Sequence, residues 1–437
     1  MPTTHVIIGS GIAGLCAAES TRQIDPQAVI RMVSEEPHEF YSRPGLAYFL
    51  RNDFPESQLT IRTPEDVAAL NLQRVHGQAD KLACDTHEIV LKDGRRVRYD
   101  RLLLATGALA VPPPFPGGNL AGVVTLDGLD DCRKIIAMAW SGYPAVVVGG
   151  GITALELAEG LNARGMKVEY FLRSTRYWAD VLDETESKIV MDRLRHEGIT
   201  IHTETQVKQA IGSDGRLTGV ETQAGKHFPC EVLAVAIGVR PRIELAKQAG
   251  LLVGKGIAVD QYLQTSAPDV FAAGDCAEVF DPVSGKPTLD VLWPTAIVQG
   301  RIAGANMAGA ARPYVKGVPY NVTMLAGLKV SIIGAVSGGA ANEDLVAITR
   351  GESEAWRVVP KSWVVGADDD VNRVRLVVGD CTIAGALVMG DQTWSRPLQQ
   401  LIIGKVDITP IRPALIAGGA EALTQLAKFH REWEKRV

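Results

Sequence analysis

Two glycine-rich segments of the same type lie 140 residues apart in the chain, at residues 9–14 (GSGIAG) and 149–154 (GGGITA). Glycines at this spacing allow a tight turn whose backbone approaches a pyrophosphate, and free N–H groups at the start of the next helix bind the anion. A single match to this pattern is a weak signal. Two matches in one chain predict that it binds two dinucleotides.

Both segments have the surroundings that the motif requires. An apolar strand precedes each turn, at residues 6–8 and 145–148, and an apolar helix follows, at residues 15–19 and 155–159. The helix lets the turn present its N–H groups, and the strand fixes where the turn begins. We therefore expect two strand–turn–helix units of the Rossmann type.

The elements that position these turns form an internal repeat typical of an α/β protein. The first unit ends in a strand within residues 99–108, and the second in a similar strand at residues 232–238. The proline-rich residues 111–116 cannot continue a strand or a helix and predict a domain boundary. The buried-strand pattern of residues 269–275 would complete the first domain, so that the second domain is inserted into it.

We predict three domains. Residues 1–112 and 240–319 form the first dinucleotide-binding domain, and residues 113–239 form the second, inserted one. Residues 320–437 form a C-terminal α+β domain, in which residues 371–378 and 382–389 predict strands of a mixed sheet flanked by helices.

Composition and charge argue against several function classes. Apolar residues make up 46% and charged residues 22% of the 437 residues, as in a globular protein of several domains. The net charge of −5 disfavours nucleic-acid binding. No apolar stretch could span a bilayer, and the first strand begins within four residues of the N-terminus, so we expect a cytoplasmic protein. The six cysteines form no C-x-x-C pair, and we expect no metal site.

The order of four motifs resembles the pyridine nucleotide–disulfide oxidoreductase superfamily of two-dinucleotide flavoproteins. They are the first glycine turn, Ala105-Thr106-Gly107, the second glycine turn and Gly274-Asp275. The C-terminal segments 321–328 and 385–391 are similar to those of NADH-dependent nitrite reductase large subunits and rubredoxin reductases. The resemblance, which extends to coenzyme A-disulfide reductases, implies an FAD-dependent NAD(P)H oxidoreductase.

The resemblance implies that FAD lies in the first domain. Glu35, 26 residues after Gly9, would accept hydrogen bonds from the adenosine ribose, and Arg43 would offer a forked donor to phosphate. Asp275 would bind the ribityl chain, and a helix beginning near Trp293 would direct its positive end at the flavin. The implied FAD contacts are Gly9, Gly11, Ala13, Gly14, Glu35, Arg43, Ala79, Thr106, Gly107, Gly274, Asp275, Trp293, Thr295 and Ala296.

The inserted domain would bind the nicotinamide cofactor. At the end of its second strand a carboxylate favours NAD, whereas basic residues favour the 2′-phosphate of NADP. Arg173 stands there, 24 residues after Gly149, with Arg176 beside it, so we expect NADPH. The alternative is that both arginines are solvated and the enzyme uses NADH. The implied contacts are Gly149, Gly151, Ile152, Thr153, Ala154, Arg173, Arg176 and Gly238.

The chain departs from the family where thiol chemistry occurs. Pro44 stands at the position of the redox cysteine, and Ile12 replaces a histidine of water-forming oxidases and peroxidases. Because proline has no nucleophile, reduction of disulfides or peroxides through a protein thiol is disfavoured. Tyr48 replaces a lysine that ferredoxin-reductase relatives place near the flavin, and Glu156 matches a family glutamate near both rings. These two side chains are the catalytic candidates.

We predict that hydride passes from nicotinamide to flavin and that electrons then leave to an external acceptor. The resemblance implies a small iron–sulfur or rubredoxin-type protein or a partner subunit as acceptor, and a homodimer built with the C-terminal domain. One alternative is a peripheral quinone reductase that lies on lipid through a C-terminal helix with Leu423, Leu426, Phe429 and Trp433 on one face. More often such a helix covers its own domain or a dimer partner. A second alternative function is that of a redox-sensing flavoprotein that binds a partner with little turnover.

Overall fold

The computed structural model describes residues 2–60, 62–336, 363–369 and 371–436. The chain divides into two compact units: unit 1 contains Met1–Ala110, Asp127–Leu129 and Val239–Lys316, and unit 2 contains Val111–Leu126, Asp130–Gly238 and Gly317–Val437. The short segment Asp127–Leu129 thus belongs to unit 1 although the chain on both sides of it belongs to unit 2. The predicted separation of a nucleotide domain from a C-terminal domain within unit 2 stays a prediction.

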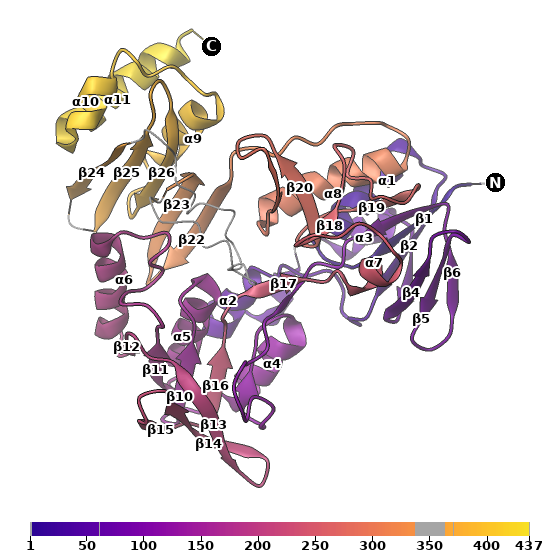
Figure 1. Cartoon of the computed structure of the whole chain (residues 1–437), viewed down its shortest axis with the longest axis horizontal. Coiled ribbons are helices and arrows are strands. Elements are labelled where there is room, and N and C mark those ends of the chain that lie inside the picture. The colour runs from indigo at the N-terminus through magenta and orange to yellow at the C-terminus, as the bar shows by residue number, and fades with distance from the viewer. Residues whose placement is uncertain (1, 61, 337–362, 370, 437) are drawn as a thin grey trace. The chain divides into compact units, whose positions relative to one another are not determined.

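Unit 1 is built on a parallel sheet with the strand order β19-β7-β1-β2-β3, of which Figure 1 labels β1, β2 and β19. The strand after the inserted residues, β19, pairs in parallel with β7, so the buried strand predicted within residues 269–275 belongs to the sheet of the first glycine turn. The five strands are β1 (Thr4–Ile8), β2 (Val29–Ser34), β3 (Leu72–His76), β7 (Arg101–Leu104) and β19 (Val270–Ala272).

Smaller sheets and short helices complete unit 1. Its further strands are β4 (Ala79–Ala83), β5 (Glu88–Leu91), β6 (Arg96–Arg98), β8 (Ala108–Ala110), β17 (Val239–Pro241), β18 (Ile257–Ala258), β20 (Ala277–Asp281) and β21 (Lys286–Leu289). Its helices are α1 (Ile12–Ile24), α2 (Gly45–Arg51), the 3-10 helix η1 (Glu56–Leu59), α3 (Pro64–Ala69), α7 (Glu244–Gln248) and α8 (Trp293–Met307). Strands β8 and β17 pair antiparallel where the chain leaves unit 1 and returns to it.

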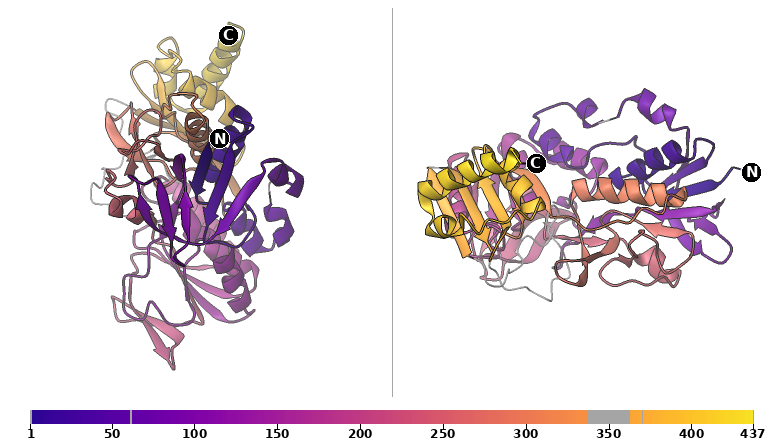
Figure 2. Two further views of the ribbon diagram at one scale, coloured as in Figure 1. Left: turned by 90° about the vertical axis from the view of Figure 1, so that its right-hand side faces the viewer. Right: turned by 90° about the horizontal axis from the view of Figure 1, so that it is seen from above.

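Helices α1 and α8 lie side by side with their backbones in contact (Figure 2). A Cβ atom on Gly300 would lie 2.3 Å from the carbonyl oxygen of Ala13, and one on Gly304 would lie 2.2 Å from that of Ala17. Such distances leave no room for a side chain at either glycine. The hydroxyl of Thr21 donates to the carbonyl of Gly304 at 3.0 Å. The two glycines therefore allow a close approach of the helix backbones that a larger residue would prevent.

Unit 2 repeats the first sheet around the second glycine turn. Its parallel sheet has the order β12-β11-β10-β16-β9, with β10 between β11 and β16 as β1 lies between β2 and β7. This arrangement confirms the predicted repeat. The strands are β9 (Val123–Val124), β10 (Pro144–Val148), β11 (Lys167–Phe171), β12 (Thr200–His202) and β16 (Val232–Val235), with an antiparallel sheet of β13 (Val207–Ser213), β14 (Arg216–Thr222) and β15 (His227–Pro229). The helices are α4 (Leu129–Met138), α5 (Ile152–Ala163) and α6 (Glu184–His196).

The C-terminal sheet is antiparallel in every described strand pair, so the predicted mixed sheet is wrong. Short connections such as β22–β23 cannot join parallel neighbours. The order is β22 (Tyr320–Leu325), β23 (Leu328–Gly334), β26 (Ile383–Met389), β25 (Asn372–Val378) and β24 (Trp363–Asp369). Helices α9 (Ser395–Ile403), α10 (Arg412–Ala417) and α11 (Gly419–Glu434) follow, and Figure 2 shows the last two lying across one face of the sheet.

The apolar stripe of α11 faces the core of its own sheet. Leu426 is completely buried, and Leu423, Phe429 and Trp433 pack against the buried side chains of the sheet and of α9. Packing on the domain itself therefore accounts for the stripe. Among the described helices, none combines the length and apolarity that crossing a bilayer requires.

A buried ion-pair cluster joins α6 to the C-terminal sheet within unit 2. Arg375 of β25 donates from Nε to Glu186 Oε1 at 2.8 Å and from Nη2 to Oε2 at 3.0 Å. Beside this pair, Arg373 donates to Asp183, the residue that caps α6, at 3.1 Å. Burial raises the pKa of Glu186, and the adjacent guanidinium opposes that shift. The two-point contact offsets part of the cost of removing both charges from water.

The contact between α1 and α8 gives a first prediction. Gly300→Ala and Gly304→Ala should each lower the free energy of unfolding by about 1–3 kcal/mol or more, because the added methyl group forces the backbones apart. Urea denaturation of purified protein measures this change. Gly317→Ala is the matched control, since its Cβ would meet no atom within 4 Å. Stabilities of all three variants within about 0.5 kcal/mol of one another would contradict the interpretation.

Candidate cofactor and active sites

The predicted FAD contacts in unit 1 follow the carboxyl ends of parallel strands. Gly9 follows β1, Glu35 follows β2, Thr106 lies just after β7, and Gly274 lies just after β19. Ala79 begins β4, after the end of β3. Because these strands are parallel, their carboxyl ends meet at one edge of the sheet, where open α/β sheets bind ligands. The structure therefore brings these positions to one edge, and their roles in binding stay predictions.

The first glycine turn has room for an anion. Gly9 has a φ of +114°, and a Cβ on it would lie 2.1 Å from the oxygen of Ala105, so this residue must be glycine. A Cβ on Gly14 would lie 2.1 Å from the oxygen of Gly9. On Gly11, in contrast, a Cβ would meet no protein atom within 4 Å, and no side chain caps α1. Open space above an uncapped helix N-terminus fits a pyrophosphate.

Three elements meet beside this turn. Gly274 has a φ of +79°, and a Cβ on it would lie 3.0 Å from the Cβ of Ala13 and 3.9 Å from that of Ala296. The turn after β19 thus contacts the first turns of α1 and α8, next to Asp275. Helix α8 begins at Trp293 and also has no side-chain cap. Its positive end therefore points at the same edge of the sheet. Trp293 and Thr295 in this first turn are half-buried.

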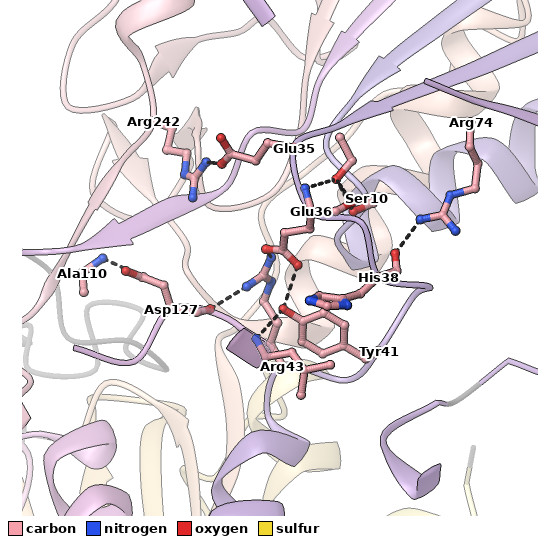
Figure 3. A network of polar contacts seen from close by, with 12 residues as sticks. Ser10, Glu35, Glu36, His38, Tyr41, Arg43, Arg74, Ala110, Asp127 and Arg242 are labelled. Carbon is pink, nitrogen blue, oxygen red and sulfur yellow. Dashed lines mark hydrogen bonds and ion pairs between the residues drawn. The ribbon is translucent and has the colours of Figure 1, made fainter. Parts of the chain in front are cut away.

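A network of charged side chains lies at the end of β2 (Figure 3). Glu35 forms an ion pair with Arg242. Its neighbour Glu36 accepts hydrogen bonds from Arg43 Nη2 at 2.5 Å and from the Tyr41 hydroxyl at 2.8 Å. Glu36 and Arg242 were not identified from the sequence, because contacts between residues far apart in the chain leave no local pattern. The two residues predicted for FAD, Glu35 and Arg43, each have a charged partner within the protein.

The same network holds the segment Asp127–Leu129. Arg43 Nη1 donates to the carbonyl of Asp127 at 2.5 Å, and the Asp127 side chain accepts from the Ala110 N–H at 2.8 Å (Figure 3). The Tyr41 hydroxyl accepts from the Leu129 N–H at 3.0 Å. Arg43 therefore has a structural role toward the backbone, besides the phosphate contact predicted for it.

Arg242 is itself held by the predicted Thr106-Gly107 turn. Its N–H donates to the carbonyl of Gly107 at 2.9 Å, and its carbonyl accepts from the Thr106 hydroxyl at 2.8 Å. These bonds fix the backbone from which the guanidinium reaches Glu35. The turns after β7 and β2 are thereby linked through a residue that follows β17.

The second glycine turn reproduces the geometry of the first in unit 2. Gly149 has a φ of +144°, and a Cβ on it would lie 2.1 Å from the oxygen of Ala236. Gly151 begins α5 without a side-chain cap, so the first turn of that helix, with Ile152, Thr153 and Ala154, offers its N–H groups. Gly238, after β16, has a φ of +118° and is the counterpart of Gly107. This cradle fits a second pyrophosphate.

The two arginines predicted to select the nicotinamide cofactor have different surroundings. Arg173 is exposed just after β11, whose last residue is Phe171. Arg176 is half-buried, and its Nη2 donates to the carbonyl of Ala179 at 3.2 Å. Its Nε is buried and has no hydrogen-bond partner among the described residues. Buried donors normally have a partner, so this N–H is suited to an anionic ligand.

The two catalytic candidates lie in different units. Glu156 is half-buried in α5 of unit 2. Tyr48 in α2 of unit 1 is 36% exposed and stacks on Phe54, with ring centroids 6.2 Å apart. Pro44 directly precedes α2 with a φ of −59° and brings no thiol to this helix. Across the described residues, no group of three histidine, cysteine or acidic side chains is arranged to hold a metal ion.

Two glycine cradles on repeated parallel sheets, each with an uncapped helix N-terminus, define a protein that binds two dinucleotides. A comparison of the sequence with models of known protein families agrees with this conclusion. A model described as pyridine nucleotide-disulphide oxidoreductase matches residues 3–308, and the chain belongs to this family. It is therefore an FAD- and NAD(P)H-dependent oxidoreductase of the two-dinucleotide flavoprotein class.

Three similar proteins show how far the likeness extends. An NADH oxidase of Methanocaldococcus jannaschii is 32% identical over 365 residues, which cover 80% of each chain. Subunit epsilon of the NADH-dependent phenylglyoxylate dehydrogenase of Aromatoleum evansii is 27% identical over 97% of this chain and 98% of the subunit. The crystal structure of a ferredoxin reductase from Rhodopseudomonas palustris has a TM-score of 0.82 and 25% identity, covering 93% of this chain and 96% of that one.

The open space at Gly11 gives a second prediction. Gly11→Val should fold normally, because a Cβ at this position would meet no protein atom within 4 Å, yet it should weaken FAD binding at least about tenfold by filling the space for the pyrophosphate. Fluorescence titration of the apoprotein with FAD measures the affinity. Gly150→Val is the matched control, since a Cβ there also meets no atom within 4 Å but lies in the other unit. Equal FAD affinities of the two variants would contradict the assignment.

Proposed function

We propose that the chain is an FAD-dependent NAD(P)H dehydrogenase that passes electrons to another protein. The acceptor would be a small iron–sulfur or rubredoxin-type carrier, or a partner subunit. The observation that carries this proposal is Pro44, which leaves no thiol where disulfide-reducing relatives have their redox cysteine. Without a sulfur relay, electrons leave the flavin directly. The likeness to a ferredoxin reductase and, over almost the whole chain, to a subunit of a larger dehydrogenase supports the proposal.

The chain contributes binding and orientation to this reaction. The cofactors, when bound, supply the hydride and electron-transfer chemistry. The helices that begin after Gly11 and Gly151 would hold the two pyrophosphates with their N–H groups. The positive end of α8 would stabilise negative charge beside the Gly274 turn. We propose Tyr48 of unit 1 and Glu156 of unit 2 as side chains that contact the bound cofactors.

NADPH is the proposed electron donor. The exposed guanidinium of Arg173 and the unpaired Nε of Arg176 support a 2′-phosphate at the end of β11. NADH is the alternative, and two of the three similar proteins carry it in their names. Assembly as a homodimer and a cytoplasmic location likewise remain predictions. The alternative of a quinone reductase on a lipid surface loses its main support, since the apolar stripe of α11 packs on its own domain.

The cofactor choice gives a third prediction. Arg173→Ser should lower kcat/KM for NADPH by about 10- to 100-fold and leave kcat/KM for NADH within about twofold, because only NADPH has a phosphate for this guanidinium. Steady-state reduction of a dye acceptor measures both constants. Arg195→Ser, which removes an arginine on the exposed surface of α6, is the control. If kcat/KM of Arg173→Ser fell equally for NADPH and NADH, this would contradict a role of Arg173 in selecting the cofactor.

The acceptor gives a fourth prediction, which tests the proposed function. Anaerobic stopped-flow reduction by NADPH should bleach the flavin band in well under a second, given turnover numbers of about 1–1000 per second. The reduced enzyme should then react at least about tenfold faster with a ferredoxin or rubredoxin than with glutathione disulfide, coenzyme A disulfide, a quinone or oxygen. Fast disulfide turnover would refute the proposal. Slow flavin reduction combined with tight binding of a partner would instead support a redox sensor.

A further inference from the structure

We propose that Gln299 and Tyr314 are positioning residues of the FAD site, forming a buried polar relay that holds the Gly274 turn in one orientation. The inference rests on FAD binding in unit 1 and is independent of the electron acceptor.

Four polar side chains behind this turn are buried although none is among the predicted cofactor contacts. Gln299 of α8 is 0% exposed, Asp290 is 2%, Lys316 is 7% and Tyr314 is 8%. Asp290 lies between β21 and α8, whereas the tyrosine and the lysine lie at the end of unit 1. Burying polar groups costs free energy unless they are paired, so such a group usually has a specific role.

The relay begins at the backbone of the turn. The N–H of Gly274 donates to Gln299 Oε1 at 2.8 Å in a buried hydrogen bond. This bond fixes a residue whose φ of +79° favours glycine and at which an added Cβ would lie only 3.0 Å from the Cβ of Ala13. Because Asp275 follows directly, the same bond sets the direction in which the predicted ribityl contact leaves the sheet.

The second link lies on the other side of the Gln299 amide. Its Nε2 donates to the Tyr314 hydroxyl oxygen at 3.4 Å. If the amide were rotated by half a turn, its NH2 group would face the Gly274 N–H, and two donors would oppose each other. The Gly274 N–H, which can only donate, therefore selects the orientation in which the glutamine oxygen faces the turn, and the Tyr314 oxygen accepts from the NH2 group on the other side.

The last link concerns the surroundings of the Tyr314 hydroxyl. Burial raises the pKa of its hydroxyl to about 12, the bond with Gln299 opposes this shift, and the negative charge of Asp290 adds to it. That carboxylate in turn faces the ammonium of Lys316, with 3.9 Å between Nζ and Oδ2 and side chains only 4% and 3% exposed. The raised pKa keeps the hydroxyl in its neutral form at neutral pH, and its oxygen accepts from the glutamine NH2 group.

Tyr314→Phe tests the relay, because it removes the hydroxyl and leaves the ring in place. We expect FAD affinity to fall about 5- to 10-fold, and the absorption maxima and the midpoint potential of the bound flavin to shift. The measurements are flavin titration of the apoprotein, the visible spectrum and a dye-coupled potential titration. Tyr262→Phe is the matched control in unit 1, because this half-buried tyrosine lies outside the relay.

Two glutamine variants separate positioning from general stability. Gln299→Glu keeps an oxygen for Gly274 but no donor for Tyr314, so its FAD affinity should resemble that of Tyr314→Phe. Gln299→Leu removes both links and should bind FAD more weakly than either. The proposal would be overturned if Tyr314→Phe lowered only the melting temperature, with FAD affinity, spectrum and potential matching those of Tyr262→Phe. None of these measurements involves an electron acceptor. If the proposed acceptor is wrong, the results for Tyr314→Phe and Gln299→Leu are therefore unaffected.

Discussion

The backbone contact between α1 and α8 is the constraint on which the site of unit 1 depends. Gly300 and Gly304 bring α8 against Ala13 and Ala17, and this places the first turn of α8 beside the start of α1. Both uncapped N-termini then face one edge of the sheet, and the turn at Gly274 fits between them. A wider separation would move one helix dipole away from the other and open the space behind the turn.

The two halves of the chain use the same backbone device and differ in the side chains around it. In both halves, a glycine with positive φ lies against the backbone that follows a neighbouring strand of the sheet, which is β7 in unit 1 and β16 in unit 2. A helix without a side-chain cap then follows the glycine. Around the first turn, ion pairs such as Glu35–Arg242 connect segments far apart in the sequence. Around the second, Arg173 and Arg176 come from a single loop. The two turns thus share one backbone geometry, and the side chains predicted to contact the cofactors differ between them.

Local patterns made the repeated sheets predictable from the sequence. Gly9 and Gly149 each need a specific backbone conformation, and the apolar strands before them have only one place in a parallel sheet. The same logic located the turns after β7 and β19. Each of these features depends on residues that are neighbours in the chain, so their spacing alone carries the information.

Features that depend on distant residues were not predictable in this way. Glu36 and Asp127 hold Arg43, and Tyr314 accepts from Gln299, but no spacing rule connects members of either group. The C-terminal strands have the apolar pattern of a sheet, yet that pattern does not distinguish antiparallel from mixed pairing. Short connections, such as those between β22 and β23 and between β25 and β26, could have indicated the antiparallel order.

The cluster of Arg375 and Glu186 bears on how such a chain could gain or lose its last hundred or so residues. Glu186 has no exposed surface, and the partner that neutralises it belongs to the C-terminal sheet. A protein shortened to its two nucleotide folds would lose both guanidinium groups together with the sheet that covers the acidic start of α6. The start of α6 and the C-terminal sheet therefore carry complementary charges, and replacing a charged residue on one side of this contact would require a matching change on the other.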